Sequence, residues 1–221
     1  YLTEKNRMVF TLMPEVETPK TDAPKAAVSA NVTAQQVIDN YAAALGGKSK
    51  LEAVKTVKTL STIKVMGMEM EATTLEMAPN KSKAVQKIMG QEMVQVFDGE
   101  KGYMMQAGQR MDLPAPAIEE AKKKRLFEVL SYNAADFKTV EKVTEEGKEL
   151  YLLAGAGKKL YFDTKTNLLV KSTSDKGDMV ILDYMEVDGI KFPKNVKLAM
   201  MGQNMEMTNN QVIVNKEVSA E

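Results

Sequence analysis

The spacing of apolar and polar residues divides the chain into a short apolar segment, a polar spacer and a long body. Residues 8–13 read Met-Val-Phe-Thr-Leu-Met, an apolar run that fits one buried strand. A single strand is not stable alone, so this one either joins the following sheet or belongs to an upstream domain. Pro14, Pro19 and Pro24 then recur every fifth residue, which predicts an extended, poorly packed spacer over residues 15–30.

The body, residues 31–221, begins with a strong helix signal. Thr33 and Gln36 have the spacing of a capping box, in which each side chain bonds the other residue's backbone N–H. A glycine pair at 46–47 ends the helix, and a second short helix is expected over about residues 49–55. Apolar residues recur between these signals at helical spacing, at Val37, Ile38, Tyr41 and Leu45.

From residue 57 onward, short runs of strand-forming residues alternate with turn residues. Turns such as Glu146-Gly147, Lys176-Gly177 and Asp188-Gly189 are short enough to join antiparallel neighbours. This pattern predicts an antiparallel meander, and therefore a curved sheet or barrel. The expected strands are 57–66, 69–78, 82–89, 93–97, 102–106, 138–145, 148–154, 158–163, 168–174, 179–186, 191–201 and 205–214.

One further helix is expected to interrupt the meander. Pro116 fits its first turn, and the acidic pair 119–120 precedes the basic run 122–125, which suits the helix dipole. The predicted fold class is mainly β with a few helices (α+β): a curved antiparallel half-barrel meander with helices covering the concave face. The apolar residues expected on one face of the interrupting helix are Ile118, Ala121, Leu126, Val129 and Leu130.

Methionine is the unusual component, with 17 copies against six Phe, seven Tyr and no Trp. The pattern Met-Gly-x-x-Met occurs three times, at 66–70, 89–93 and 201–205, and each copy falls at a predicted hairpin. Our strand count places all three hairpins on one rim of the sheet. An additional strand near residues 109–113 would move the third copy to the opposite end.

Three interpretations of these methionines remain open. In the first, flexible and polarizable methionines line the opening of a binding site for lipids or hydrophobic peptides. In the second, they are core residues that happen to lie near strand ends. In the third, their clustered thioether sulfurs ligate Cu(I). The first interpretation gives the candidate ligand-binding residues Met66, Met68, Met70, Met89, Met93, Met201, Met205 and Met207.

Composition excludes several kinds of catalytic site. The chain has no His and no Cys, so it cannot build a His-based triad or zinc site, a thiolate nucleophile or an Fe–S cluster. The acidic pairs at 119–120 and 145–146 are sequence neighbours that do not converge. Residues 155–158 are predicted as a hairpin turn rather than a phosphate loop, and residues 163–167 as an Asx-type turn rather than a calcium loop. We therefore predict no catalytic residue, no metal and no cofactor.

Charge and hydropathy restrict the partners. Thirty basic and thirty acidic residues cancel, so no footprint for nucleic acid is visible. No apolar run reaches the roughly 20 residues of a membrane-spanning helix. The basic run 122–125 is expected to be the solvated face of its helix, with acidic lipid headgroups as the alternative partner.

Several stretches resemble the periplasmic lipoprotein-carrier superfamily with the LolA/LolB-like fold. They are the helical start 33–55, the segment Val-Phe-Asp-Gly-Glu-Lys-Gly-Tyr at 96–103, residues 161–171, and Asp-Gly-Ile-Lys-Phe-Pro at 188–193. The resemblance implies an open curved sheet around an apolar cavity that binds acyl chains without chemistry, in the periplasm or at the outer membrane. It also implies a helical lid, which would carry the further candidate ligand-binding residues Ile118, Leu126 and Val129, together with Leu130.

A second resemblance concerns the start of the chain. Residues 1–7, Tyr-Leu-Thr-Glu-Lys-Asn-Arg, through Leu-Met-Pro at 12–14 are similar to the closing segment of pitrilysin/insulinase-like zinc peptidase domains. This implies an upstream peptidase end (1–14), a linker (15–30) and a carrier-like domain (31–221), with the His-x-x-Glu-His zinc site upstream of this chain. Since the chain begins at Tyr1 rather than Met, we expect a cleaved product or a fragment, with any signal peptide outside it.

Two functions of different classes follow. The first is a non-catalytic domain that binds lipid or another apolar ligand, accessory to a larger secreted zinc peptidase. The alternative is a protein–protein docking module that presents substrate or anchors the peptidase at the envelope, without a small-molecule ligand.

Overall fold

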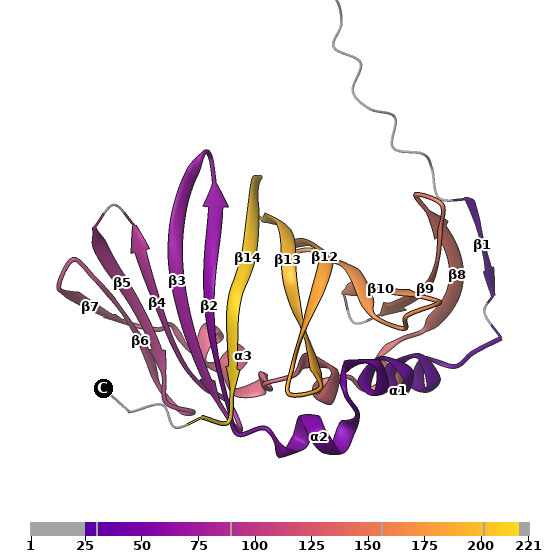
Figure 1. Cartoon of the computed structure of the whole chain (residues 1–221), viewed down its shortest axis with the longest axis horizontal. Helices are drawn as coiled ribbons and strands as arrows, with labels where there is room; N and C mark the ends of the chain where they lie inside the picture. The colour runs from indigo at the N-terminus through magenta and orange to yellow at the C-terminus, as the bar shows by residue number, and fades with distance from the viewer. Residues whose placement is uncertain (1–24, 30, 89, 156, 201, 217–221) are drawn as a thin grey trace, which may run out of the picture.

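The computed structural model describes residues 25–29, 31–88, 90–155, 157–200 and 202–216. Within these residues, fourteen strands form one antiparallel sheet in the order β1-β8-β9-β10-β11-β12-β13-β14-β2-β3-β4-β5-β6-β7. The two end strands of this order do not pair with each other, so the sheet is open. Figure 1 shows it as a curved band, with α1 and α2 along the edge opposite the β2–β3 and β13–β14 hairpins.

The elements have the following bounds. The helices are α1 (Ala34–Leu45), α2 (Lys48–Ala53) and α3 (Ala115–Lys123), with the 3₁₀ turns η1 (Glu128–Ser131) and η2 (Ala134–Asp136). The strands are β1 (Lys25–Ser29), β2 (Thr56–Val65), β3 (Met68–Met77), β4 (Lys81–Ile88), β5 (Gln91–Phe97), β6 (Gly102–Gln106), β7 (Gln109–Asp112), β8 (Thr139–Glu145), β9 (Lys148–Gly155), β10 (Lys158–Asp163), β11 (Leu169–Ser174), β12 (Gly177–Val187), β13 (Ile190–Met200) and β14 (Gln203–Val214).

The predicted fold class is confirmed, and short-range chemistry explains much of it. The Gln36 backbone N–H donates to Thr33 Oγ1 at 3.2 Å, and the Thr33 N–H donates to Gln36 Oε1 at 2.9 Å, so the predicted capping box is present. At Met66-Gly67, Glu146-Gly147 and Asp188-Gly189 both residues have positive φ, as two-residue type I′ hairpins require. These turns match the twist of the flanking strands and fix the register of the meander.

Two strands were not expected. Lys25–Ser29, the end of the predicted spacer, forms β1 and pairs with β8. Gln109–Asp112 forms β7, an edge strand with all four residues exposed, so it lacks the apolar alternation by which strands are recognised. The expected strand at residues 8–13 lies outside the described residues.

The interrupting helix is shorter than predicted. α3 ends at Lys123, so Leu126 follows it in irregular chain, while Val129 and Leu130 belong to η1. The expectation of one continuous apolar helix face was therefore wrong. α3 itself has no buried residue, so no apolar packing extends it through the basic run 122–125.

The hydrophobic core lies under only part of the sheet. We call the face against which α1 packs the concave face; there α1 buries its apolar stripe against β9–β14, around the fully buried Phe162 and Leu153. The outer arm, defined as β3–β7, contributes only Ala72 and Phe97 to the buried apolar residues of the described chain. One arm of the half-barrel is thus packed, whereas the other has a largely uncovered inner surface.

Replacing Thr33 with Ala tests whether α1 depends on its cap. The substitution removes the hydroxyl that accepts the Gln36 N–H, and we expect it to lower the free energy of unfolding by about 1 kcal/mol. Urea denaturation followed by circular dichroism measures this change. Ser49→Ala, at an exposed position of α2, is the control; an equal loss in both variants would contradict the assigned role of the cap.

Candidate functional site

A large hollow lies on the concave face, between the sheet and the crossover segment that joins β7 to β8. Its volume is about 880 Å³. The crossover segment, defined here as residues 115–131, contains α3 and η1 and lies behind β2 and β14 in the view of Figure 1. We call this hollow the concave cavity.

The sequence of α3 explains why the space is not filled. Ala117, Glu120, Ala121 and Lys124 line the cavity and follow one another at spacings of three, one and three residues, so they share one face of the helix. The two residues of this face that have no long side chain are alanines. An inner face built on Ala117 and Ala121 holds the segment over the sheet but leaves room beneath it.

One side of the cavity is apolar. Leu45 of α1 and the segment residues Leu126 and Val129 face strand residues that belong to the main core. Aromatic rings reinforce this side, since the Phe127 and Phe192 centroids lie 5.6 Å apart. The strand residues that complete the apolar lining are Val57, Leu169, Met179, Ile181, Phe192 and Val212.

The other side of the cavity is polar, and its carboxylates are paired. Glu76 Oε1 of β3 lies 2.7 Å from Lys124 Nζ, and Glu128 Oε1 lies 3.2 Å from Lys158 Nζ. Glu120 pairs with Lys176, whose hydrogen bond and charge lower the pKa of the Glu120 carboxyl. These contacts also tie the crossover segment to β3, to β10 and to the β11–β12 turn.

Charge contacts, rather than apolar packing, attach α3 to the sheet. Besides the Glu76 and Lys176 ion pairs, Asn80 Nδ2 donates to the Lys122 carbonyl at 3.3 Å. Exposed ion pairs typically contribute only about 0–1 kcal/mol each and are weakened by salt. α3 is thus a weakly attached cover, in contrast to α1, which buries five side chains.

The tyrosines near the cavity are neutral. Burial raises the pKa of Tyr41, which lines the cavity, to about 12, and it also raises the pKa values of Tyr132 and Tyr184. The Tyr184 hydroxyl donates to the Leu169 carbonyl at 2.8 Å. These hydroxyls therefore keep their protons at physiological pH and do not act as phenolate bases.

The three methionine hairpins lie on the same edge of the sheet, as the sequence predicted. Because all neighbouring strands are antiparallel, the order of strands puts the β2–β3, β4–β5 and β13–β14 turns at one end. The additional strand β7 does not move the third Met-Gly-x-x-Met hairpin to the other end of the sheet. The crossover segment compensates for it, because it carries the chain from one end of the strands to the other before β8 begins. Met89 and Met201, which belong to two of these hairpins, lie outside the described residues.

Register places most of the described candidate methionines on the concave face. In β2, Ile63 and Val65 point to the same face as the buried Val57. Met207 and Met70 lie opposite Ile63 on its two neighbours, and Met205 and Met68 lie opposite Val65 in the same way. Along β2, these two rows lie between the cavity, which Val57 and Thr59 line, and the edge of the sheet that carries the methionine hairpins. They therefore form a wall above the cavity.

The outer arm continues this methionine-lined surface. Residues opposite each other on neighbouring strands point to the same face. Met93 is opposite Gln86, Gln86 is opposite Ala72, and Ala72 is opposite the buried Ser61 of β2, so Met93 lies on the concave face. Met104 and Met111, which sequence analysis did not single out, are opposed to each other on this face. The methionine wall is defined here as Met68, Met70, Met93, Met104, Met111, Met205 and Met207.

Other sequence candidates lie elsewhere. Met66 occupies the tip of its hairpin and is 77% exposed. Ile118 lines a separate hollow of about 500 Å³ with Tyr103, Arg110 and Leu113, so it does not join Leu126 and Val129 at the concave cavity. Sequence reasoning missed Ala117 as a lining residue, because small residues leave no apolar signal even where they create space.

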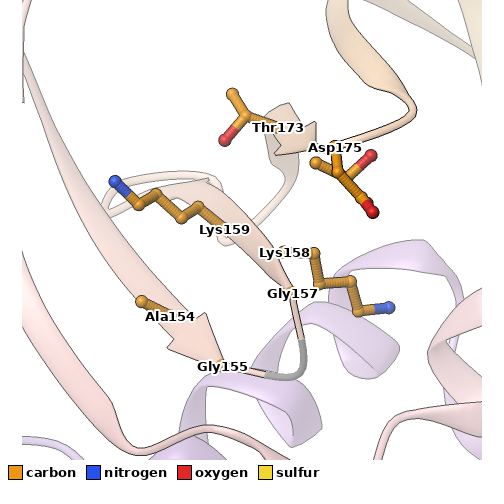
Figure 2. Close-up of a pocket in the computed structure, with 8 residues that line it drawn as sticks. Ala154, Gly155, Gly157, Lys158, Lys159, Thr173 and Asp175 are labelled. Atoms are coloured by element: carbon orange, nitrogen blue, oxygen red, sulfur yellow. The ribbon is translucent and has the colours of Figure 1, made fainter.

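A third hollow, of about 400 Å³, lies at the β9–β10 hairpin and is shown in Figure 2. Gly155 and Lys158 are opposed there across a two-residue turn, as the sequence predicted. Gly155 is required because a Cβ at this position would lie 2.0 Å from the Asp136 carbonyl oxygen. The side chains of Lys158 and Lys159 point in different directions, and Lys158 forms an ion pair with Glu128. The two ammonium groups therefore do not converge on one ligand.

The Asx-type turn at Asp163 is also present. Its Oδ1 accepts hydrogen bonds from the backbone N–H groups of Lys165 and Thr166 at 2.9 and 2.8 Å. Among the described residues, no three or more Asp or Glu side chains are grouped to hold a metal ion. No helix in the described part of the chain has the length and apolarity to cross a membrane.

Two solved structures share this architecture at low sequence identity. A DUF1329 family protein from Desulfovibrio piger matches with a TM-score of 0.54 and 8% identity, over 84% of this chain and 95% of that chain. A domain described as outer membrane lipoprotein-sorting, from Vibrio parahaemolyticus, matches with a TM-score of 0.53 and 9% identity, over 85% and 96% of the two chains. The open, curved fold implied by the sequence resemblance is thus confirmed. No protein-family model matches the sequence, and no protein of curated function is similar to it in sequence.

Hydrogen exchange tests the weak attachment of α3. We expect the amides of residues 117–123 to exchange about ten-fold faster than those of residues 38–45, because α3 is held by exposed ion pairs and α1 by buried apolar contacts. Raising the salt concentration to about 1 M should widen this difference by screening those pairs. Mass spectrometry of peptic peptides measures both effects; equal protection of the two helices would contradict the assignment.

Proposed function

We propose that this domain is a non-catalytic carrier that binds lipid or another apolar ligand inside its half-barrel. The observation that carries the proposal is the concave cavity of about 880 Å³, lined on one side by core residues of the sheet and on the other by the crossover segment. This volume falls within the range of ~300–1,000 Å³ typical of small-molecule pockets. The fold shared with a lipoprotein-sorting domain supports the same conclusion.

The proposed ligand site combines the cavity with the methionine wall. Leu126 and Val129 contact the ligand within the cavity, and Met68, Met70, Met93, Met205 and Met207 contact it above. Unbranched methionine side chains repack around chains of different length at little cost. The proposal also includes the hairpin residues Met66, Met89 and Met201 as the rim of the mouth, with Ile118 as a lid residue outside the cavity itself.

The cellular setting is part of the proposal. We place the domain in the periplasm or at the outer membrane, in keeping with the lipoprotein-sorting neighbour. The resemblance of residues 1–14 to the end of a zinc peptidase domain supports a role as an accessory domain of a larger secreted peptidase. Because this chain has no His, that role requires a His-x-x-Glu-His zinc site upstream of Tyr1.

A second candidate function rests on the edge of the outer arm. All four residues of β7 are exposed, and its outer side has no neighbouring strand in the described chain. Such an edge can accept an extended peptide as an additional strand. A docking module of this kind would present substrate to a peptidase, or anchor it at the envelope, without using the cavity.

A cavity-filling substitution tests the carrier function. Ala121→Trp places an indole on the inner face of α3, where we expect it to occupy the cavity and weaken the binding of a fluorescent fatty-acid probe at least ten-fold. Ala115→Trp, on the same helix but exposed and outside the cavity lining, should leave the affinity unchanged. Probe titration gives both values. Undiminished binding in the Ala121 variant would place the ligand elsewhere, and an absence of binding by the native chain would favour the docking module.

Removing the methionine wall gives an independent test. We expect the fourfold variant Met68→Ser, Met70→Ser, Met93→Ser, Met205→Ser to abolish binding of the same probe while the protein remains folded, because these side chains are exposed or half-buried. The control is Met77→Ser with Met105→Ser, two exposed residues on the convex face. If the fourfold variant unfolds while a less drastic Met→Leu version binds normally, the methionines are core residues and this part of the proposal fails.

A further inference from the structure

The lining of the concave cavity has an uncompensated positive charge. Its three carboxylates, Glu76, Glu120 and Glu128, are each paired with a lysine. The cavity is also lined by Lys123, Arg125 and Lys191, and none of these has a carboxylate within 4.0 Å among the described residues. The carboxylates are therefore already neutralised, whereas three cations remain available to a ligand.

This excess is local and does not reflect the composition of the chain. The whole sequence has 30 basic and 30 acidic residues, so a surface chosen at random would carry no net charge. Lys191 has Glu186 opposite it on β12, but the two side chains do not form an ion pair, and Glu186 is not part of the cavity lining. What sets this hollow apart is that three cations without an ion pair in the described chain line it together with apolar core residues.

The two sides of the cavity match the two ends of an amphiphile. Arg125 directly precedes Leu126 and Lys191 directly precedes Phe192, and all four residues line the cavity, so one molecule can contact both kinds of residue. The guanidinium of Arg125 suits a carboxylate or a phosphate because it can donate two parallel hydrogen bonds, and Lys123 and Lys191 add point charges. The apolar side favours a hydrocarbon tail in proportion to the area that the tail buries.

We propose that the ligand is an anionic amphiphile whose carboxylate or phosphate head is held by Lys123, Arg125 and Lys191 and whose tail lies on the apolar side of the cavity. This inference rests on the proposed carrier function and adds the chemistry of the headgroup to it. A neutral lipid of the same tail length would gain the apolar contacts but not the charge-assisted hydrogen bonds.

Pairs of probes that differ only in the headgroup test the inference. Oleic acid is compared with oleyl alcohol, and lysophosphatidic acid with monooleoylglycerol, each below its aggregation concentration and measured by displacement of a fluorescent probe. We expect at least one anionic member to bind ten-fold or more tightly than its neutral partner, and to lose that preference as salt is raised. Preference in the first pair identifies a carboxylate head, and preference in the second identifies a phosphate head.

A charge-removal variant locates the effect. Lys123→Gln, Arg125→Gln and Lys191→Gln together should reduce the affinity for the preferred anionic probe to that of its neutral partner, while the neutral affinity stays unchanged. The control variant removes the same charge outside the cavity, at Lys138, Lys159 and Lys194, and should retain the preference.

The outcomes separate this inference from the carrier function. Equal affinity for both members of both pairs overturns the headgroup inference but leaves the carrier in place. Equal loss of preference in the two charge variants overturns the assignment to these three residues. Failure of the native chain to bind any of the four probes overturns the carrier function itself.

Discussion

The uneven cover of the concave face is the constraint on which the rest of the structure depends. A β-sheet must bury its apolar face against another layer, and here the apolar stripe of α1 shares one core with β9–β14 and with Val57 of β2. Among the described residues of the outer arm, only Ala72 and Phe97 are buried apolar residues, so this arm shares little of that core. Curvature brings the two arms around a shared hollow, so the molecule has a firm core at one side and an internal surface at the other.

The crossover segment completes the enclosure without filling it. Alanines at 117 and 121 on its inner face hold it away from the sheet, and its attachments are ion pairs such as Lys124–Glu76. Contacts of this kind fix a position but add little free energy, in contrast to the apolar burial of α1. In the carrier that we propose, the ligand supplies the apolar contacts that the outer arm and α3 do not make with each other.

The methionine wall fits this arrangement. Rigid aromatic side chains would define a cavity of one shape, whereas methionines such as Met70 and Met207 rearrange with the ligand. Their sulfur-containing chains are apolar enough for acyl groups, yet half-exposed positions on an open sheet tolerate them without a bound ligand. The unpaired cations at the cavity supply the second, polar half of recognition.

Local signals in the sequence determined much of the fold. The capping box at Thr33, the positive-φ pairs such as Glu146-Gly147 and the alternation of the strands identified α1, the hairpins and the meander, because each depends on residues close together in the chain. The common rim of the methionine hairpins was predicted from a count that lacked β7, and it holds because the crossover segment carries the chain to the opposite end of the sheet before β8. The exposed edge strand β7 and the early end of α3 were missed, because neither carries an apolar pattern of its own.

The candidate site was only partly predictable. Leu126 and Val129 were expected at the cavity, but Ala117, Lys123 and Lys191 gain their roles from long-range neighbours that only the tertiary structure brings together. The pairing of Glu76 with Lys124, 48 positions apart, decides which cations are left free, and no local rule contains that information. The sequence by itself therefore determined the elements and their order, whereas the tertiary structure decided the cavity and its charge, because empty space and unpaired charge are properties of how distant segments meet.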